Sequence, residues 1–104
     1  MTTSDRGMQS VSEVVDRLTK AGYAEQFRAQ AGGLYALREG TLHAPESLVV
    51  EEVERFEGTT DPGEEAIVFG LRCVEHGTRG TYTLTYGPGV DPLDAEMMQR
   101  LERH

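Results

Sequence analysis

Acidic side chains crowd the middle of the chain, and their oxygens are the first candidates for chemistry. Eight acids and one base lie between Glu46 and Glu65, out of 18 acids and 10 bases in 104 residues. Carboxylates are the hard oxygen ligands that magnesium and calcium prefer. The candidate ligand-binding or cation-binding residues of this region, together with its one arginine, are Glu51, Glu52, Arg55, Glu57, Asp61, Glu64 and Glu65.

The same acids have two other interpretations. Their spacing is not that of an EF-hand, which needs acids at alternate positions before an internal glycine, and a solvated turn between two strands explains them as well. Arg55 is either an anchor for a carboxylate or phosphate or a structural partner of the neighbouring acids. Adaptation to high salt would also account for Lys20 being the single lysine of the chain.

Cys73 and His76 are close enough in sequence for a metal pair or for thiolate chemistry. The strand pattern around Cys73 puts the thiol on a buried face and His76 in the following turn, which favours a core thiol and a surface imidazole. The three histidines, His43, His76 and His104, have no recognisable ligand spacing. We therefore predict no bound metal, no cofactor and no catalytic residue.

Composition excludes several classes of partner. The net charge of −8 argues against binding to nucleic acids and to anionic membranes, because both require lysine and arginine to neutralise phosphates. No stretch approaches the roughly 20 apolar residues of a membrane span. One cysteine allows no intramolecular disulfide, and the polar first residues do not resemble a signal peptide, so we expect a cytoplasmic protein of bacterial type.

Two helices are expected near the ends of the chain. Ser10 and Glu13 have the spacing of a capping box, apolar residues follow at helical spacing, and Gly22 supplies a stop, which predicts a helix over 11–21. Asp91 and Pro92 are typical of the start of a last helix, whose apolar residues recur every four positions at Leu93, Met97 and Leu101.

Strands are expected between the helices. Over 66–75 the apolar residues alternate, and after a glycine-flanked turn the residues of 81–86 alternate again, with Tyr82, Leu84 and Tyr86 facing inward and Thr81, Thr83 and Thr85 outward. Two short strands, 34–37 and 41–44, are joined by a turn over 38–40.

The segment 48–57 fits two elements. As a helix it would place Val49, Val53 and Phe56 on one face; as a strand it would place Leu48, Val50 and Phe56 on one face. We favour the strand, because a short turn-rich loop connects it to the strand that follows, as successive antiparallel strands require.

These elements predict an α+β fold of two layers. Two amphipathic helices must bury their apolar stripes, so an antiparallel β-meander is expected with the N-terminal and C-terminal helices packed on one face. Residues 1–9 are predicted to be a flexible leader and residues 10–104 a single domain.

The second half of the chain resembles a family of small uncharacterised bacterial proteins of about this length, whose members often carry the automatic label phosphoribosylpyrophosphate synthetase. The residues that carry the resemblance are Arg55-Phe56-Glu57-Gly58, Asp61-Pro62, the strand from Ala66, Gly80, Tyr86-Gly87, Asp91-Pro92-Leu93 and Glu96-Met97. The resemblance implies no particular activity, ligand or catalytic residue.

The label itself makes a testable claim about residues. A phosphoribosylpyrophosphate loop places two acids after an apolar strand and then small residues whose N–H groups cradle phosphate. Glu51-Glu52 follows an apolar run and Gly58-Thr59-Thr60 comes later, but the five residues of 53–57 between them are bulky and carry two further acids. This intervening segment disfavours the synthetase activity.

Two functions from different classes remain. We expect a non-enzymatic interaction or accessory module, binding a protein partner or a second copy through a sheet edge or through the face of Thr81, Thr83 and Thr85. The alternative is a magnesium-dependent enzyme or binding protein for a phosphorylated sugar or nucleotide, built on the acidic strand and loop.

Overall fold

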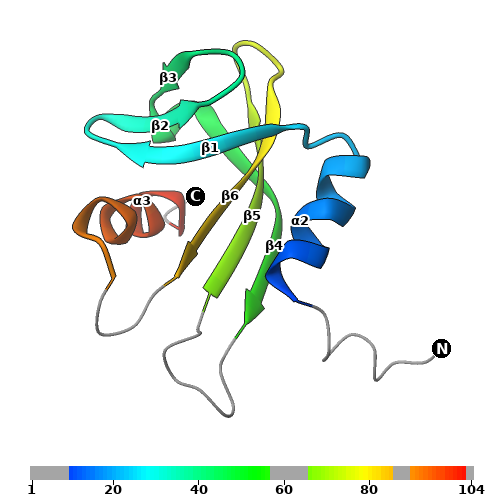
Figure 1. The fold of residues 1–104 in the computed structure, drawn as a ribbon. Coiled ribbons are helices and arrows are strands. Elements are labelled where there is room, and N and C mark those ends of the chain that lie inside the picture. Colours follow the sequence, from blue (N-terminus) through cyan, green and yellow to red (C-terminus); the bar gives the residue numbers. More distant parts are fainter. Residues whose placement is uncertain (1–9, 57–65, 86–89, 103–104) are drawn as a thin grey trace, which may run out of the picture.

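The computed structural model describes residues 10–56, 66–85 and 90–102. They form a six-stranded mixed sheet, in the order β3-β2-β1-β6-β5-β4, with two α-helices (Figure 1). The α+β class is therefore confirmed. The expected leader over 1–9, the loop over 57–65 and the inward position of Tyr86 lie outside the described residues.

The sheet consists of two antiparallel meanders. The first contains β1 (Glu25–Gln30), β2 (Gly33–Ala36) and β3 (Thr41–His43), and the second contains β4 (Leu48–Phe56), β5 (Ala66–Cys73) and β6 (Arg79–Thr85). A parallel pair of β1 with β6 joins them through two residue pairs, Glu25 with Gly80 and Gln26 with Thr81. The expectation of a purely antiparallel sheet is wrong at this junction.

Helix α2 (Val11–Lys20) confirms the predicted N-terminal helix. Its capping box is complete, since the Glu13 N–H donates to Ser10 Oγ at 3.1 Å and the Ser10 N–H donates to Glu13 Oε1 at 3.0 Å. After the helix, Gly22 takes the left-handed φ of +116°, which glycine adopts without steric cost.

Helix α3 (Pro92–Glu102) confirms the predicted C-terminal helix. Asp91 Oδ1 accepts the Leu93 N–H at 2.8 Å, and Pro92 is the first helical residue. Met97 and Leu101 are buried. A short 3₁₀ turn, η1 (Pro45–Ser47), connects β3 to β4 and packs against α3.

Local patterns predict most strands correctly. β2, β3, β5 and β6 lie where they are expected, and the ambiguous segment is a strand over Leu48–Phe56. β1 was not predicted. Its apolar positions, Phe27 and Ala29, alternate with exposed polar residues, but a buried carboxylate at Glu25 and two glutamines obscure the pattern.

A β-bulge changes the faces of β4. Val50 lies opposite Leu71 and Glu52 lies opposite Gly70, so Glu51 is the extra residue. Residues after the bulge are therefore shifted by one, and Phe56 packs in the cluster of Val14 and Leu18 rather than beside Leu48. The prediction that Phe56 shares a face with Leu48 and Val50 is wrong for this reason.

The two helices cover opposite faces of the second meander (Figure 1). Met97 and Leu101 of α3 pack with Ile67, Phe69 and Leu71 of β5, while Val14 and Leu18 of α2 pack with Val68, whose side chain points to the other face. The prediction that both helices share one face is wrong, because β5 is apolar on both sides and requires a cover on each.

The expected threonine face is only partly exposed. Thr83 and Thr85 are exposed, but Thr81 is 3% exposed, because it pairs with Gln26 of β1 on a strand that α2 also covers. Neither described helix is long and apolar enough to cross a membrane.

Candidate functional site

The predicted acidic residues divide into two groups. Glu51, Glu52 and Arg55 lie on β4. Glu57, Asp61, Glu64 and Glu65 lie outside the described residues. What the structure brings together around β4 is a set of acids paired with arginines from other elements.

Glu51 is the centre of the first cluster. Its carboxylate accepts the Arg72 Nε–H at 2.6 Å and the Tyr23 hydroxyl at 2.9 Å, and Arg79 Nε lies 3.8 Å away. The Arg79 guanidinium also lies 5.8 Å from the centre of the Tyr23 ring. The hydrogen bonds from Arg72 and then Tyr23 lower the pKa of the Glu51 carboxyl. We call these four residues the Glu51 cluster.

Other acids of this part of the chain also meet arginines. Glu46 Oε2 accepts from Arg100 of α3 at 2.6 Å, and Glu54 lies 3.7 Å from Arg17 of α2. The acids that lie close together in the sequence are thus paired with arginines from four different elements, α2, α3, β5 and β6. Long-range pairing of this kind leaves no trace in local sequence.

Glu52 and Arg55 are exposed and point to different faces of β4. Glu52 lies opposite Gly70, where a Cβ would come within 3.0 Å of the Glu52 Cβ and 3.3 Å of the Tyr23 ring, so it shares the α2 face. Arg55 lies opposite Ile67, which packs on the α3 face. These two residues do not converge on one point.

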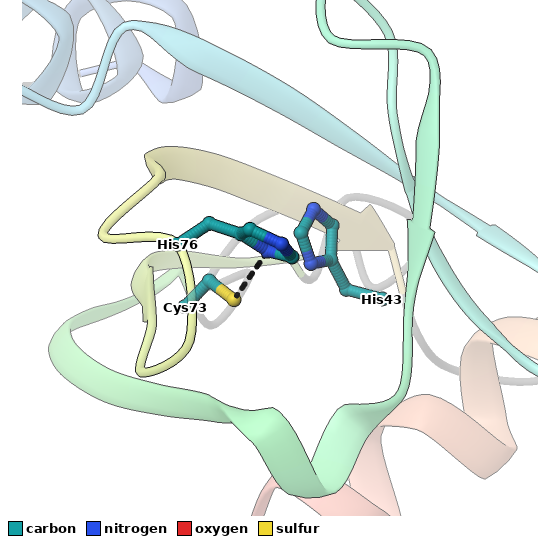
Figure 2. A group of neighbouring side chains, drawn as sticks. All are labelled: His43, Cys73 and His76. Atoms are coloured by element: carbon teal, nitrogen blue, oxygen red, sulfur yellow. Dashed lines mark hydrogen bonds between the residues drawn. The ribbon is translucent and has the colours of Figure 1, made fainter.

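A second cluster contains nitrogen and sulfur donors. His43 at the end of β3, Cys73 at the end of β5 and His76 in the β5–β6 turn lie with one ligand atom of each within 4.8 Å of the others (Figure 2). Cys73 Sγ is 3.6 Å from His76 Nδ1, and the two imidazole rings meet edge to face with centres 5.6 Å apart. We call these three residues the His–Cys–His cluster.

The positions of Cys73 and His76 agree with the sequence. Cys73 is buried and His76 is exposed, as expected of a core thiol and a turn imidazole. The position of His43 beside Cys73 and His76 was not predicted, and its side chain is 3% exposed. It follows from η1: the chain turns directly from β3 into β4, whose first residue, Leu48, pairs with Cys73.

Glu39 fixes the orientation of the His43 ring. One carboxylate oxygen contacts His43 Nε2 at 2.8 Å and the other accepts the Thr78 hydroxyl at 2.9 Å. These two hydrogen bonds lower the pKa of Glu39, so the carboxylate is ionised and can only accept. The His43 Nε2 atom therefore donates its hydrogen to Glu39, and Nδ1 is the ring nitrogen that Glu39 does not occupy.

A buried carboxylate holds the turn that carries Glu39. Glu25 is 6% exposed, and its oxygens accept the backbone N–H groups of Gln26, Arg38 and Glu39 at 2.8–2.9 Å. Three charge-assisted hydrogen bonds compensate for burying the acid. Glu25 was not among the predicted site residues, which all lie between Glu51 and Glu65.

A groove opens where the two meanders separate. Beyond the pair of Gln26 with Thr81, β1 and β6 diverge without further pairing among the described residues. The groove has a volume of about 350 Å³ and is lined by residues of both strands and both helices, among them Phe27, Ala29, Tyr82, Thr83 and Asp94. The Tyr82 hydroxyl donates to Asp94, and burial followed by this hydrogen bond raises the pKa of Tyr82.

Comparison with known proteins finds no relative. No protein-family model matches the chain, and neither the curated proteins nor the solved structures contain a match. The resemblance in the second half of the chain therefore stays a prediction, and function must be argued from the geometry.

Proposed function

We propose that the protein is a non-enzymatic interaction module of the bacterial cytoplasm and that it takes an extended segment of a partner protein into the groove between β1 and β6. The observation that carries this proposal is the early end of the β1–β6 ladder. Phe27 to Gln30 on one side and Tyr82 to Thr85 on the other continue as strands without each other as partners.

Strand edges bind extended chains by main-chain hydrogen bonding. An added strand in such a groove gains affinity from the backbone ladder and specificity from pockets for alternate side chains. Here the half-buried Ala29 and the exposed Leu37 offer apolar surface, with Arg28 and Asp94 supplying charges of opposite sign. The fitting partner is a segment that alternates apolar and polar residues and carries little net charge.

The outer edges of the sheet are less suited to this role. β4 is the last strand on one side, and its exposed Glu52 and Arg55 together with Glu54 place charges along it, which protects an edge against pairing. β3 on the other side has three residues. The groove is therefore less charged than the β4 edge and longer than the β3 edge.

The magnesium alternative draws no support from the Glu51 cluster. Both Glu51 oxygens already have donors, Arg72 on one and Tyr23 on the other, and Arg79 adds a second guanidinium. A cation would have to displace these groups. The proposal accordingly assigns no catalytic residue and no cofactor to the acidic strand.

A peptide-display selection tests the proposal. Immobilised protein is screened with random peptides of neutral charge, and the enriched sequences are synthesised and titrated by fluorescence anisotropy. Thr83→Arg fills the groove and should weaken binding about tenfold or more, which corresponds to at least roughly 1.4 kcal/mol. Thr85→Arg is the matched control, because Thr85 is exposed on the same strand and does not line the groove.

Three outcomes would overturn the proposal. The first is a screen that enriches no common pattern, and the second is an equal loss of affinity in both arginine variants. The third is a stable dimer in light scattering that Thr83→Arg turns into a monomer, which would give the groove to a second copy of the chain.

A further inference from the structure

We propose that the His–Cys–His cluster is a binding site for a zinc-class transition-metal ion, with His43 Nδ1, Cys73 Sγ and His76 Nδ1 as ligands. The site lies at the β5–β6 turn and shares no residue with the proposed peptide groove. The inference is therefore independent of the proposed function.

The spacing of the donor atoms fits a tetrahedral ion. Zinc–nitrogen bonds of about 2.0–2.1 Å and zinc–sulfur bonds of about 2.3 Å require a nitrogen and a sulfur ligand to lie about 3.6 Å apart. Cys73 Sγ and His76 Nδ1 are 3.6 Å apart, and all three donors lie within 4.8 Å of one another. Rotation of the exposed His76 side chain can supply the remaining contraction.

Glu39 prepares His43 for this role. Metal-binding histidines commonly donate the other ring N–H to a carboxylate, which fixes the tautomer and makes the ligating nitrogen more basic. His43 Nε2 donates to Glu39, and Thr78 holds the second carboxylate oxygen. Glu25 in turn holds the backbone N–H of Glu39. The imidazole is oriented by residues that would not themselves touch the ion.

The site opens to solvent on one side. A groove of about 370 Å³ passes over His43 and His76 and is also lined by Leu42, Ser47, Val74 and Glu75. Figure 2 shows the three side chains converging from β3, from β5 and from the β5–β6 turn. Three protein ligands and an open side leave the fourth position for water or a small ligand, as in zinc sites that are not purely structural.

Donor chemistry selects the ion. A thiolate and two imidazoles suit zinc, cobalt and copper, whereas magnesium and calcium require oxygen ligands. Binding replaces the Cys73 thiol proton by the metal, and that proton passes to solvent; no electron is transferred. The predicted acids of β4 are thus not needed for the metal chemistry of this protein.

Cobalt is the probe that reports on these ligands directly. Chelator-treated protein titrated with Co²⁺ should bind one equivalent and develop a thiolate-to-cobalt charge-transfer band together with the visible bands of tetrahedral cobalt. Zn²⁺ should displace the cobalt and bleach both, since zinc binds tetrahedral thiolate sites more tightly. Magnesium should leave the spectrum unchanged.

Variants separate ligands from neighbours. His76→Gln changes an exposed residue, so the fold should persist while affinity falls about 100-fold or more. Cys73→Ser should abolish the charge-transfer band, with circular dichroism as the check on folding. His104→Gln removes the remaining histidine of the chain and is the matched control, with unchanged affinity.

Glu39→Gln tests positioning. It should keep the one-to-one stoichiometry and the charge-transfer band, weaken affinity about tenfold and shift the visible bands, because the carboxylate tunes His43 without binding the ion. Failure of the wild-type protein to develop the band, or a band that survives in His76→Gln at unchanged affinity, would overturn the site. Loss in His104→Gln alone would assign the metal to the chain end instead.

Discussion

Two neighbouring residues of β5 belong to two side-chain clusters of different chemical character. Arg72 points to the α2 face and joins the Glu51 cluster, whereas Cys73 points to the opposite face and joins the His–Cys–His cluster. In the first, Arg72 and Tyr23 donate hydrogen bonds to one carboxylate and Arg79 forms an ion pair with it. In the second, one ligand atom from each of two histidines and a cysteine lie within 4.8 Å of one another.

The difference shows what each cluster can do. Matched ion pairs at a partly exposed site fix geometry and are weakened by salt. A cluster of nitrogen and sulfur donors gains stability when a cation binds between them. Charge density in the sequence identified the first cluster as the candidate site, but donor geometry favours the second.

The largest expected loss of stability comes from a substitution that displaces the backbone of the His–Cys–His cluster. A Cβ at Gly33 would lie 2.2 Å from the His43 carbonyl oxygen, so Gly33→Ala must displace β3 and His43 with it. We expect a loss of about 3 kcal/mol in unfolding free energy by urea titration. The control is Gly70→Ala, where a Cβ would meet the Glu52 side chain at 3.0 Å and about 1 kcal/mol is expected. Equal losses of unfolding free energy in the two variants would contradict the claim that the Gly33 site is the more tightly packed.

Removing the buried acid below the second cluster should come next. Glu25→Ala leaves the N–H groups of Arg38 and Glu39 without their acceptor. The expected loss is about 2 kcal/mol, with faster amide exchange at these two positions. Gln30→Ala on the same strand is exposed and should change stability by less than about 0.5 kcal/mol. If the two variants are alike, the carboxylate does not anchor the turn.

The first cluster should respond to pH and salt, with a smaller effect because Glu51 is partly exposed. The pKa of Glu51 is lowered in the folded state, so its contribution is present above the ordinary carboxyl value of 4.5 and is lost as the pH falls through the folded pKa. Glu51→Gln should therefore lower the thermal midpoint at neutral pH, and the difference from wild type should vanish in strong acid.

Salt distinguishes the two clusters in the same assay. Molar sodium chloride should reduce the effect of Glu51→Gln, because arginines are the partners of Glu51. The effect of Glu39→Gln should depend less on salt, because a histidine N–H and a hydroxyl are its partners. Identical salt dependence would show that Glu39 also acts as one member of a surface ion pair.

The smallest expected loss of stability concerns an exposed ion pair near the Glu51 cluster. Arg17 and Glu54 are 3.7 Å apart, and their side chains are 50% and 37% exposed. Arg17→Ala should change the unfolding free energy by less than about 0.5 kcal/mol. Arg72→Ala should cost more, since Arg72 Nε donates to Glu51 at 2.6 Å. The reverse order would mean that α2 is held to β4 by charge rather than by apolar packing.

Local sequence sufficed for elements whose signals are local. The capping box at Ser10 and Glu13, the cap at Asp91 and the alternation along β5 each depend on neighbours within a few residues. The register of β4 could not be predicted from local sequence, because no residue pattern around Glu51 marks the bulge there.

One overlooked signal concerned the layers. From Ala66 to Leu71 the apolar run is nearly continuous, with no polar residue on the second face. Such runs are typical of strands that are buried on both sides. Attention to Val68 as well as to Ile67 and Phe69 would have predicted a helix on each face.

The candidate site was predictable only in part. Glu51 was recognised as a candidate, but its partners come from α2's C-terminal loop, β5 and β6, and no spacing rule connects them. His43 and Cys73 meet because η1 and the Leu48 pairing bring β3 to the end of β5. Contacts of this kind depend on topology rather than on periodicity.

The parallel junction of β1 and β6 pairs residues that are far apart in the sequence, which leads us to expect that it forms late in folding. Consecutive strands of each meander lie close together in the sequence, whereas pairing Glu25 with Gly80 closes a loop of about half the chain. Local hairpins form first and long-range pairs later. We therefore expect the close backbone approach at Gly80, which leaves no room for a Cβ beside the Glu25 carbonyl oxygen, to form after the pairs within each meander.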